Sequence, residues 1–440
     1  MKFRSIVGKS PAVTFREALL QGMAPDGSLY VPERIPPLPA SCLDQLRFHS
    51  LHTLGQEVLS LFIDEIPSED LLQIVRKAWT FPIPLVQIES DLFLLELFHG
   101  PTLAFKDVGA RFMAQVLSYL LGKEERRITI AVATSGDTGS AVAHGFFGVP
   151  HIEVFVLYPS GKISRLQEQQ MTTLGGNIHA IEVDGTFDDC QRLVKQALTD
   201  EELVRTRNLT TANSINLGRL LPQITYYVWA VAQLQRMIGR TSSDGVVQTP
   251  SVVVPSGNFG NLTAALYAGS MGAPIKSFVA ATNANDVVPE YLKSGTYTPR
   301  PSVQTYSNAM DVGDPSNLAR LQALYGFDVG RIQRDIEAMS VSDDETVAEI
   351  RQTFERTGRI LDPHTAVGVS AARRMLAAGR ISSPVIVTAT AHPAKFPEVV
   401  EKALGKQIPL PSALEQALKL PKQSTPLPAD FRAWRGLLMG

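Results

Sequence analysis

The sequence predicts an α/β protein built on two doubly wound, mainly parallel sheets, preceded by a helical N-terminal domain. After residue 85, short apolar runs rich in β-branched residues alternate with segments of helical length, which is typical of parallel sheets. Several of these runs are apolar almost throughout, as expected for strands that are covered on both faces. We expect strands at residues 92–97, 128–133, 152–157, 178–183, 251–254, 277–281 and 385–389.

Composition and charge exclude several classes of protein. The length of 440 residues suggests about three domains, and 44% hydrophobic with 19% charged residues is typical of a globular protein. The formal net charge of -2 offers no basic patch for nucleic acid, and no apolar run reaches the roughly 18 residues that span a bilayer. The first residues lack the apolar core of a secretion signal. We therefore expect a cytoplasmic protein without a nucleic-acid or membrane partner.

The residue types that commonly bind metals form no familiar motif. Neither Cys42 nor Cys190 lies in a C-x-x-C pair, and the eight histidines lack the spacing of H-E-x-x-H or a similar motif. We therefore expect neither a disulfide framework nor a metal site.

Proline-rich and polar stretches indicate how the chain is divided. Residues 1–80 have a mainly helical pattern that is interrupted by a proline-rich connector at 31–39. A polar stretch at 241–245 and a proline-containing stretch at 295–303 mark two further breaks. The proline-rich tail at 421–428 is expected to run over the surface.

A glycine-rich turn at 256–261 directly follows the expected strand at 251–254 and precedes a helical segment. Ligands of open parallel sheets bind beyond the carboxyl ends of the strands. Glycine allows close backbone approach, and the free N–H groups of a helix start attract anions. The turn is therefore a candidate phosphate cradle, although it could simply connect two elements. It matches neither a Walker A loop nor the G-x-G-x-x-G fingerprint of dinucleotide binding.

Two other turns carry polar side chains in comparable positions. Residues 134–141 follow the expected strand at 128–133 with several hydroxyl groups and one carboxylate, more than a single helix cap requires. Residues 212–219 end in Arg219, whose planar guanidinium can hold a phosphate or carboxylate through two bonds. Arg219 could instead be a surface residue near a helix start.

Lys106 follows the expected strand at 92–97 and lies where a helix is expected to begin, near residue 104. A helix N-terminus and partial burial both lower the pKa of a lysine, which is what a Schiff-base lysine needs. By itself the segment favours an ordinary solvated lysine. Together with a phosphate cradle and hydroxyl-rich turns, however, Lys106 indicates a site for pyridoxal phosphate (PLP).

Six motifs make the chain closely similar to the threonine synthases of the long, bacterial-type branch, which are PLP enzymes of the tryptophan-synthase-β fold type, or fold type II. The motifs lie at residues 15–32, 97–107, 133–139, 256–261, 281–286 and 390–396. The resemblance covers essentially the whole chain. It implies a division into an N-terminal domain (1–80), a small domain (108–214) and a large PLP-binding domain (81–107 with 215–440).

The resemblance also implies roles for individual residues. Lys106 would form the Schiff base with the cofactor and act as the catalytic base and acid, and the hydroxyl of Thr390 would bond the pyridine nitrogen. Asp137 or Asn213 would contact the 3′-oxygen, and the choice between them is open. The phosphate of the cofactor would be held by backbone N–H groups of Gly257, Asn258, Phe259, Gly260 and Asn261. The phosphate of the substrate would be held by Ser135, Thr138, Ser214 and Arg219, with Lys162 as a weaker candidate.

The implied reaction converts O-phospho-L-homoserine and water to L-threonine and phosphate, the last step of threonine biosynthesis. Two alternatives remain open at this point: a related PLP-dependent dehydratase or phospho-lyase that releases a 2-ketoacid, and a non-catalytic PLP-binding module. The sequence does not distinguish a monomer from a homodimer.

Overall fold

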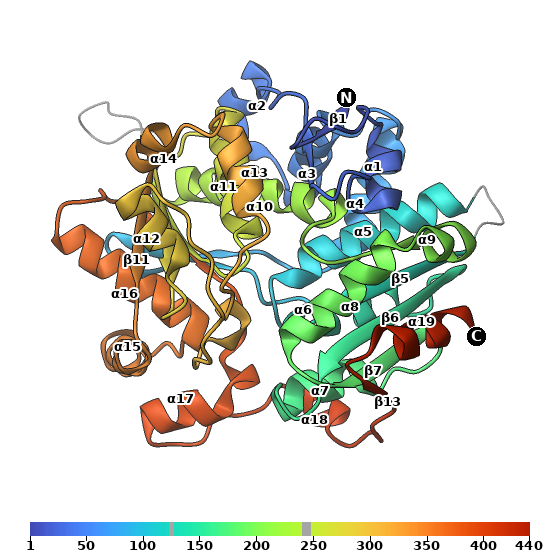
Figure 1. Cartoon of the computed structure of the whole chain (residues 1–440). Helices are drawn as coiled ribbons and strands as arrows, with labels where there is room; N and C mark the ends of the chain where they lie inside the picture. Colours follow the sequence, from blue (N-terminus) through green and yellow to red (C-terminus); the bar gives the residue numbers. More distant parts are fainter. Residues whose placement is uncertain (123–126, 240–247) are drawn as a thin grey trace.

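The computed structural model describes residues 1–122, 127–239 and 248–440, so the break expected at 241–245 lies outside the described residues. Its strands form three sheets, of which two dominate the molecule (Figure 1). No helix within the described part of the chain is both long and apolar enough to cross a membrane.

The larger sheet has six strands in the order β11-β10-β9-β12-β4-β3. All neighbours are parallel except β3, which runs antiparallel to β4. Alternate residues along the strands pack into two separate hydrophobic clusters, one on each face of the sheet. The sheet is therefore covered on both sides, as predicted. The strands are β3 (Leu85–Glu89), β4 (Leu92–Glu96), β9 (Ser251–Pro255), β10 (Ser277–Thr282), β11 (Ile336–Ser340) and β12 (Val385–Ala389).

The strands at the two edges of this sheet were not expected from the sequence. β3 and β11 are only partly buried, and both alternate or mix apolar with polar residues. An edge strand needs no continuous apolar run, because part of its surface meets water. The pattern that identified the central strands is therefore absent at the edges.

The second sheet has five parallel strands in the order β13-β7-β6-β5-β8. The expected strands at 128–133, 152–157 and 178–183 are confirmed as β5 (Ile128–Ala133), β6 (Ile152–Pro159) and β7 (Ile178–Asp184). They are joined by the two-residue β8 (Leu209–Thr210).

The proline-rich tail corrects one prediction, because it does not simply run over the surface. Residues Thr425–Pro428 form β13, which pairs with β7 at the edge of the second sheet. Proline is tolerated there because an edge strand does not need every N–H group. The following helix α19 (Phe431–Met439) packs the fully buried Trp434 against the same sheet. The tail thus joins the sheet built mainly by residues 108–214.

The N-terminal segment is mainly helical, as expected, but it also contains a two-stranded antiparallel sheet, β1 (Phe3–Ser5) with β2 (Tyr30–Pro32). Capping boxes start α1 (Phe15–Gln21) at Thr14 and α3 (Leu51–Ser60) at Ser50. The segment shares one core with the central helices, and the indole of Trp79 donates to the carbonyl of Val108 over 3.0 Å.

The helices cover the sheets and separate them. Figure 1 shows the second sheet with α6, α8 and α19 on one side of the molecule, and α12, α15 and α16 on the other. The central helices α5 and α10 pack against each other and against the N-terminal helices.

In chain order the helices are α1 (Phe15–Gln21), α2 (Ala40–Asp44), α3 (Leu51–Ser60), α4 (Ser68–Ala78), α5 (Lys106–Leu121), α6 (Asp137–Phe146), α7 (Arg165–Thr172), α8 (Phe187–Thr199), α9 (Glu201–Arg207), α10 (Leu217–Ile238), α11 (Gly260–Ser270), α12 (Val287–Ser294), α13 (Leu318–Leu324), α14 (Val329–Asp335), α15 (Asp343–Thr357), α16 (Pro363–Ala377), α17 (Pro397–Leu404), α18 (Ser412–Ala417) and α19. Short 3₁₀ turns lie at η1 (Leu46–Phe48), η2 (Asn308–Met310) and η3 (Pro393–Lys395).

Candidate active site

One cavity is lined by residues that follow strands of both large sheets, at the starts of α5, α6, α10 and α11. It gathers every predicted site residue except one: Lys106, Ser135, Asp137, Thr138, Asn213, Ser214, Arg219, Gly257, Asn258, Phe259, Gly260, Asn261 and Thr390. Lys162, the weaker candidate, is the exception. It is exposed in the turn after β6, where its N–H bonds the carbonyl of Pro159, and it does not line the cavity.

Lys106 is the first residue of α5, as predicted, and it is held close to Thr390. The N–H of Phe105 donates to the carbonyl of Thr390 over 2.8 Å, which ties the start of α5 to the end of β12. Burial lowers the pKa of Lys106 to about 8; the charges of Arg219 and Lys395 act in the same direction, and Asp137 acts against them. The lysine can therefore lose its proton close to neutral pH.

Asp107, the next residue, fixes the turn that leads into α5. Its buried carboxylate accepts the N–H of Thr102 over 2.8 Å and the hydroxyl of Thr102 over 2.7 Å. Burial raises the pKa of Asp107 to about 6, in spite of these two bonds. Asp107 thus holds the backbone before Lys106 and is not among the residues that line the cavity.

The turn at 256–261 has the backbone shape of an anion cradle. Phe259 adopts a left-handed conformation (φ 60°), after which α11 begins at Gly260. A Cβ atom on Gly257 would lie 2.7 Å from the Cα of Met310, so only glycine fits without displacing backbone. The cradle therefore presents the first N–H groups of α11 to the cavity.

Asn261 gives this cradle a side-chain donor. Its Oδ1 accepts the hydroxyls of Tyr226 over 2.5 Å and Tyr227 over 2.6 Å. Its Nδ2 is buried and finds no hydrogen-bond partner among the residues that the structure describes. Buried donors are normally bonded, so this donor indicates a bound anion, and the cradle fits the phosphate of PLP.

Two asparagines hold the turns around the cavity in place. Asn258 donates to the hydroxyl of Ser214 over 2.5 Å and accepts the N–H of Ser316 over 2.6 Å. The amide of Asn213 accepts the N–H of Ala133 over 3.1 Å and donates to its carbonyl over 2.7 Å. Asn213 is thus largely committed to the backbone at the end of β5.

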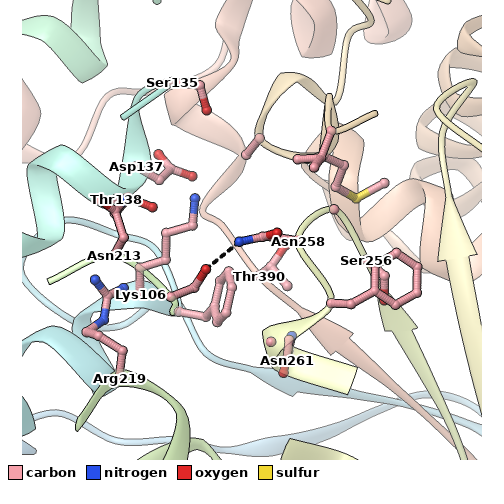
Figure 2. A pocket seen from close by; sticks show the side chains of 18 of the residues that line it. Lys106, Ser135, Asp137, Thr138, Asn213, Arg219, Ser256, Asn258, Asn261 and Thr390 are labelled. Atoms are coloured by element: carbon pink, nitrogen blue, oxygen red, sulfur yellow. Dashed lines mark hydrogen bonds between the residues drawn. The ribbon is translucent and has the colours of Figure 1, made fainter. Parts of the chain in front are cut away.

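Arg219 lies on the other side of Lys106 from Asn261, on the side of Thr138 and Asp137 (Figure 2). Its Nη1 donates to the carbonyl of Ala212 over 2.6 Å, whereas its buried Nε has no partner within the described residues. Burial lowers the pKa of Arg219 to about 10, which still leaves it a cation at neutral pH. Arg219 is therefore a candidate for binding a second anion, across Lys106 from the cradle.

Two residues of functional interest were missed from the sequence. His364 lines the cavity, with Nδ1 bonded to Asp362 over 2.8 Å and Nε2 accepting the N–H of Ala309 over 3.1 Å. Lys395 is fully buried and forms an ion pair with Asp137, with 2.7 Å between Nζ and Oδ1. Lys395 belongs to the motif at 390–396, but its partner is far away in the sequence, so no local signal could identify the pair.

Three family models match the chain in succession. Residues 2–79 match "Threonine synthase N terminus", residues 80–390 match "Pyridoxal-phosphate dependent enzyme", and residues 365–437 match "Threonine synthase, C-terminal".

Curated relatives and solved structures agree with these models. Threonine synthase of Escherichia coli is 46% identical over 440 residues, covering 100% of this chain and 99% of the relative. The enzyme of Haemophilus influenzae is 46% identical over 443 residues, covering 100% of both. Crystal structures of threonine synthase from E. coli (TM-score 0.92, 45% identity, 100% and 99% coverage) and of the PLP-bound enzyme from Brucella melitensis (0.90, 37%, 100% and 98%) superpose over the whole chain.

Proposed function

The chain belongs to the threonine synthases, a family of PLP-dependent carbon–oxygen lyases, and on that premise we propose the roles of its site residues. It has threonine synthase activity, and its cofactor is pyridoxal 5′-phosphate. We propose that the substrates are O-phospho-L-homoserine and water, and that the products are L-threonine and phosphate. The geometry that supports this is a pair of candidate anion sites on opposite sides of one half-buried lysine that lines the cavity.

The cofactor would lie between the two sheets. Lys106 would bind its aldehyde, the cradle at 257–261 with the Nδ2 of Asn261 would bind its phosphate, and the Thr390 hydroxyl would bond its ring nitrogen. When bound, PLP supplies an electron sink for the charge that develops at the α-carbon of the substrate.

Lys106 would then move protons. A pKa of about 8 is close to the ideal for a general base at neutral pH, so the amine can take the Cα proton and return it at a later position. Asp107 and Thr390 support this role by fixing the backbone before Lys106, through Thr102 and Phe105.

The substrate phosphate would bind on the Arg219 side of the cavity, with hydroxyls from Ser135, Thr138 and Ser214. The observation that carries this proposal is the buried Nε of Arg219, which has no hydrogen-bond partner among the described residues. A dianion needs at least one such charge-assisted bond, and a dehydratase acting on an uncharged side chain would not.

The test measures phosphate release from O-phospho-L-homoserine and separates threonine from 2-oxobutanoate. Arg219→Met should lower the rate of threonine formation by about 100-fold or more, because it removes a charge-assisted bond from a buried site. Arg374→Met is the matched control, since Arg374 is exposed and bonds Glu345 outside the cavity.

Other outcomes would favour the alternatives. If the unaltered chain released 2-oxobutanoate in place of threonine, the reaction would be that of a lyase. If it bound PLP but released no phosphate, it would be a binding module. An Arg219→Met variant with the rate of the control would refute the assigned phosphate site.

The division into three domains, the cytoplasmic location and the monomeric or homodimeric state stay predictions.

A further inference from the structure

Lys395 is a buried cation that connects the two large sheets at the cavity. It is the last residue of η3, which follows β12 of the larger sheet, and its side chain is 0% exposed. Its Nζ lies 2.7 Å from Oδ1 of Asp137, at the start of α6, and donates to the carbonyl of Thr102 over 2.7 Å. A charge so deeply buried persists only with a partner.

Asp137 is the acidic residue that lines the cavity beside Lys106. Its Oδ1 receives Lys395 and also the Nε2 of Gln167 over 3.0 Å. Figure 2 shows the Lys106 amine pointing toward the Asp137 carboxylate. Burial alone raises the pKa of Asp137, but the positive charges of Lys395 and Lys106 hold it well below its ordinary value.

We propose that Lys395 is a positioning residue, which neutralises the Asp137 carboxylate and holds it beside the Lys106 amine. The proposal deepens the proposed function, since it rests on Lys106 as the residue that carries the proton. It also explains how a carboxylate can occupy this place at all: Lys395 compensates its charge independently of any ligand.

Four other groups bear on the balance of charge. Arg219 from α10 disfavours the protonated form of Lys106, and His364 from α16 favours the ionised form of Asp137. Asp107 raises the pKa of Arg219; the pKa of Asp107 is itself raised by burial and lowered by the charges of Lys395 and Arg111. None of these groups forms an ion pair with Asp137, so within the described residues only Lys395 neutralises it directly.

The consequence for Lys106 has a definite sign. Without the charge of Lys395, Lys106 loses a repulsive neighbour and becomes the nearest counter-ion of Asp137. Both effects stabilise the ammonium form, so Lys106 should keep its proton to a higher pH. Neutralising Asp137 should have the opposite effect, because an attractive partner is lost.

The experiment uses the full chain freed of cofactor, so that its readout does not depend on turnover. Amines are labelled with a short pulse of acetic anhydride across a pH series, and the peptide with Lys106 is quantified by mass spectrometry. The exposed Lys162 in the same samples corrects for the pH dependence of the reagent. The midpoint of Lys106 labelling is compared among the variants.

Lys395→Met and Lys395→Gln should each raise the midpoint by about one pH unit, and Asp137→Asn should lower it. Gln167→Met is the matched control: it removes a neutral donor to the same Oδ1 atom and should leave the midpoint within about 0.3 units of the parent. If Lys395→Met is not recovered folded, Lys395→Gln carries the test, because it keeps a hydrogen-bond donor and removes only the charge.

Unchanged midpoints in the Lys395 variants would overturn the proposal. So would a shift in Lys395→Met alone, because that result would assign the effect to hydrogen bonding or packing. Threonine formation by the parent chain is assayed separately, so a failure of the proposed function and a failure of this inference give different results.

Discussion

Replacing Gly257 by alanine tests the shape of the phosphate cradle with a single methyl group. The new Cβ would lie 2.7 Å from the Cα of Met310 and 3.0 Å from the carbonyl oxygen of Ala309. Both neighbours are backbone, and ordinary contacts begin near 3.4 Å, so the cradle or the segment at 309–310 must move by several tenths of an ångström. Overpacking of this kind costs about 1–3 kcal/mol.

Gly257→Ala should weaken the binding of the cofactor more than it lowers the stability of the fold. A displaced cradle loses at least one charge-assisted bond to the phosphate, which is worth about 1.5–3 kcal/mol, or roughly 10- to 100-fold in affinity. The dissociation constant of PLP for the cofactor-free protein, measured by absorbance titration, should rise by that factor. The melting temperature is measured in the same samples.

Gly436→Ala is the matched control. Gly436 lies inside α19 with nothing within 4 Å of its added Cβ. The same substitution should there leave cofactor affinity unchanged and stabilise the helix by about 0.5–1 kcal/mol. If Gly257→Ala bound PLP as tightly as the parent, the cradle would not be the phosphate site.

Two further predictions follow from Lys106 and from the C-terminal tail. Because burial lowers the pKa of Lys106 from 10.5 to about 8, its reactive unprotonated form accumulates above that pH. The rate at which the cofactor-free chain takes up PLP, followed by stopped-flow absorbance, should therefore rise with pH and level off above about 8; a rate still rising tenfold per pH unit at pH 10 would contradict this. Trp434→Ala should lower the free energy of unfolding by about 3–5 kcal/mol in denaturant titrations, because Trp434 is fully buried against the second sheet; a loss below about 1 kcal/mol would mean that the tail is dispensable.

Much of the fold could be predicted because its central strands carry their own signal. β5 and β9 are buried at every position, and their sequences are correspondingly mostly apolar or β-branched. β11 and β13 carry no such signal, since one mixes polar residues into a half-exposed edge and the other contains two prolines. Their places depend on the neighbouring strand that offers them hydrogen bonds.

The candidate site likewise contains features that the local sequence predicts and features that it does not. The turn at 256–261, the hydroxyl-rich turn at 134–141 and the helix that begins at Lys106 are local features, because the backbone needs of a turn or a helix start restrict residue types over a few positions. Lys162 also lies in a local turn, but it does not line the cavity, and no short-range pattern shows which turns reach the cavity.

The sequence alone predicted the sheet class and the family, and it singled out Lys106 and the turn at 256–261 as candidates for the Schiff-base lysine and the phosphate cradle. Only the tertiary structure decided what Asp137 faces, which donors of Arg219 and Asn261 stay unpaired within the described chain, and where the tail pairs. The physical reason is that steric preferences act between neighbours in the chain, whereas charge compensation and burial act between neighbours in space. Lys395 and Asp137 become a pair only when the two sheets come together around the cavity.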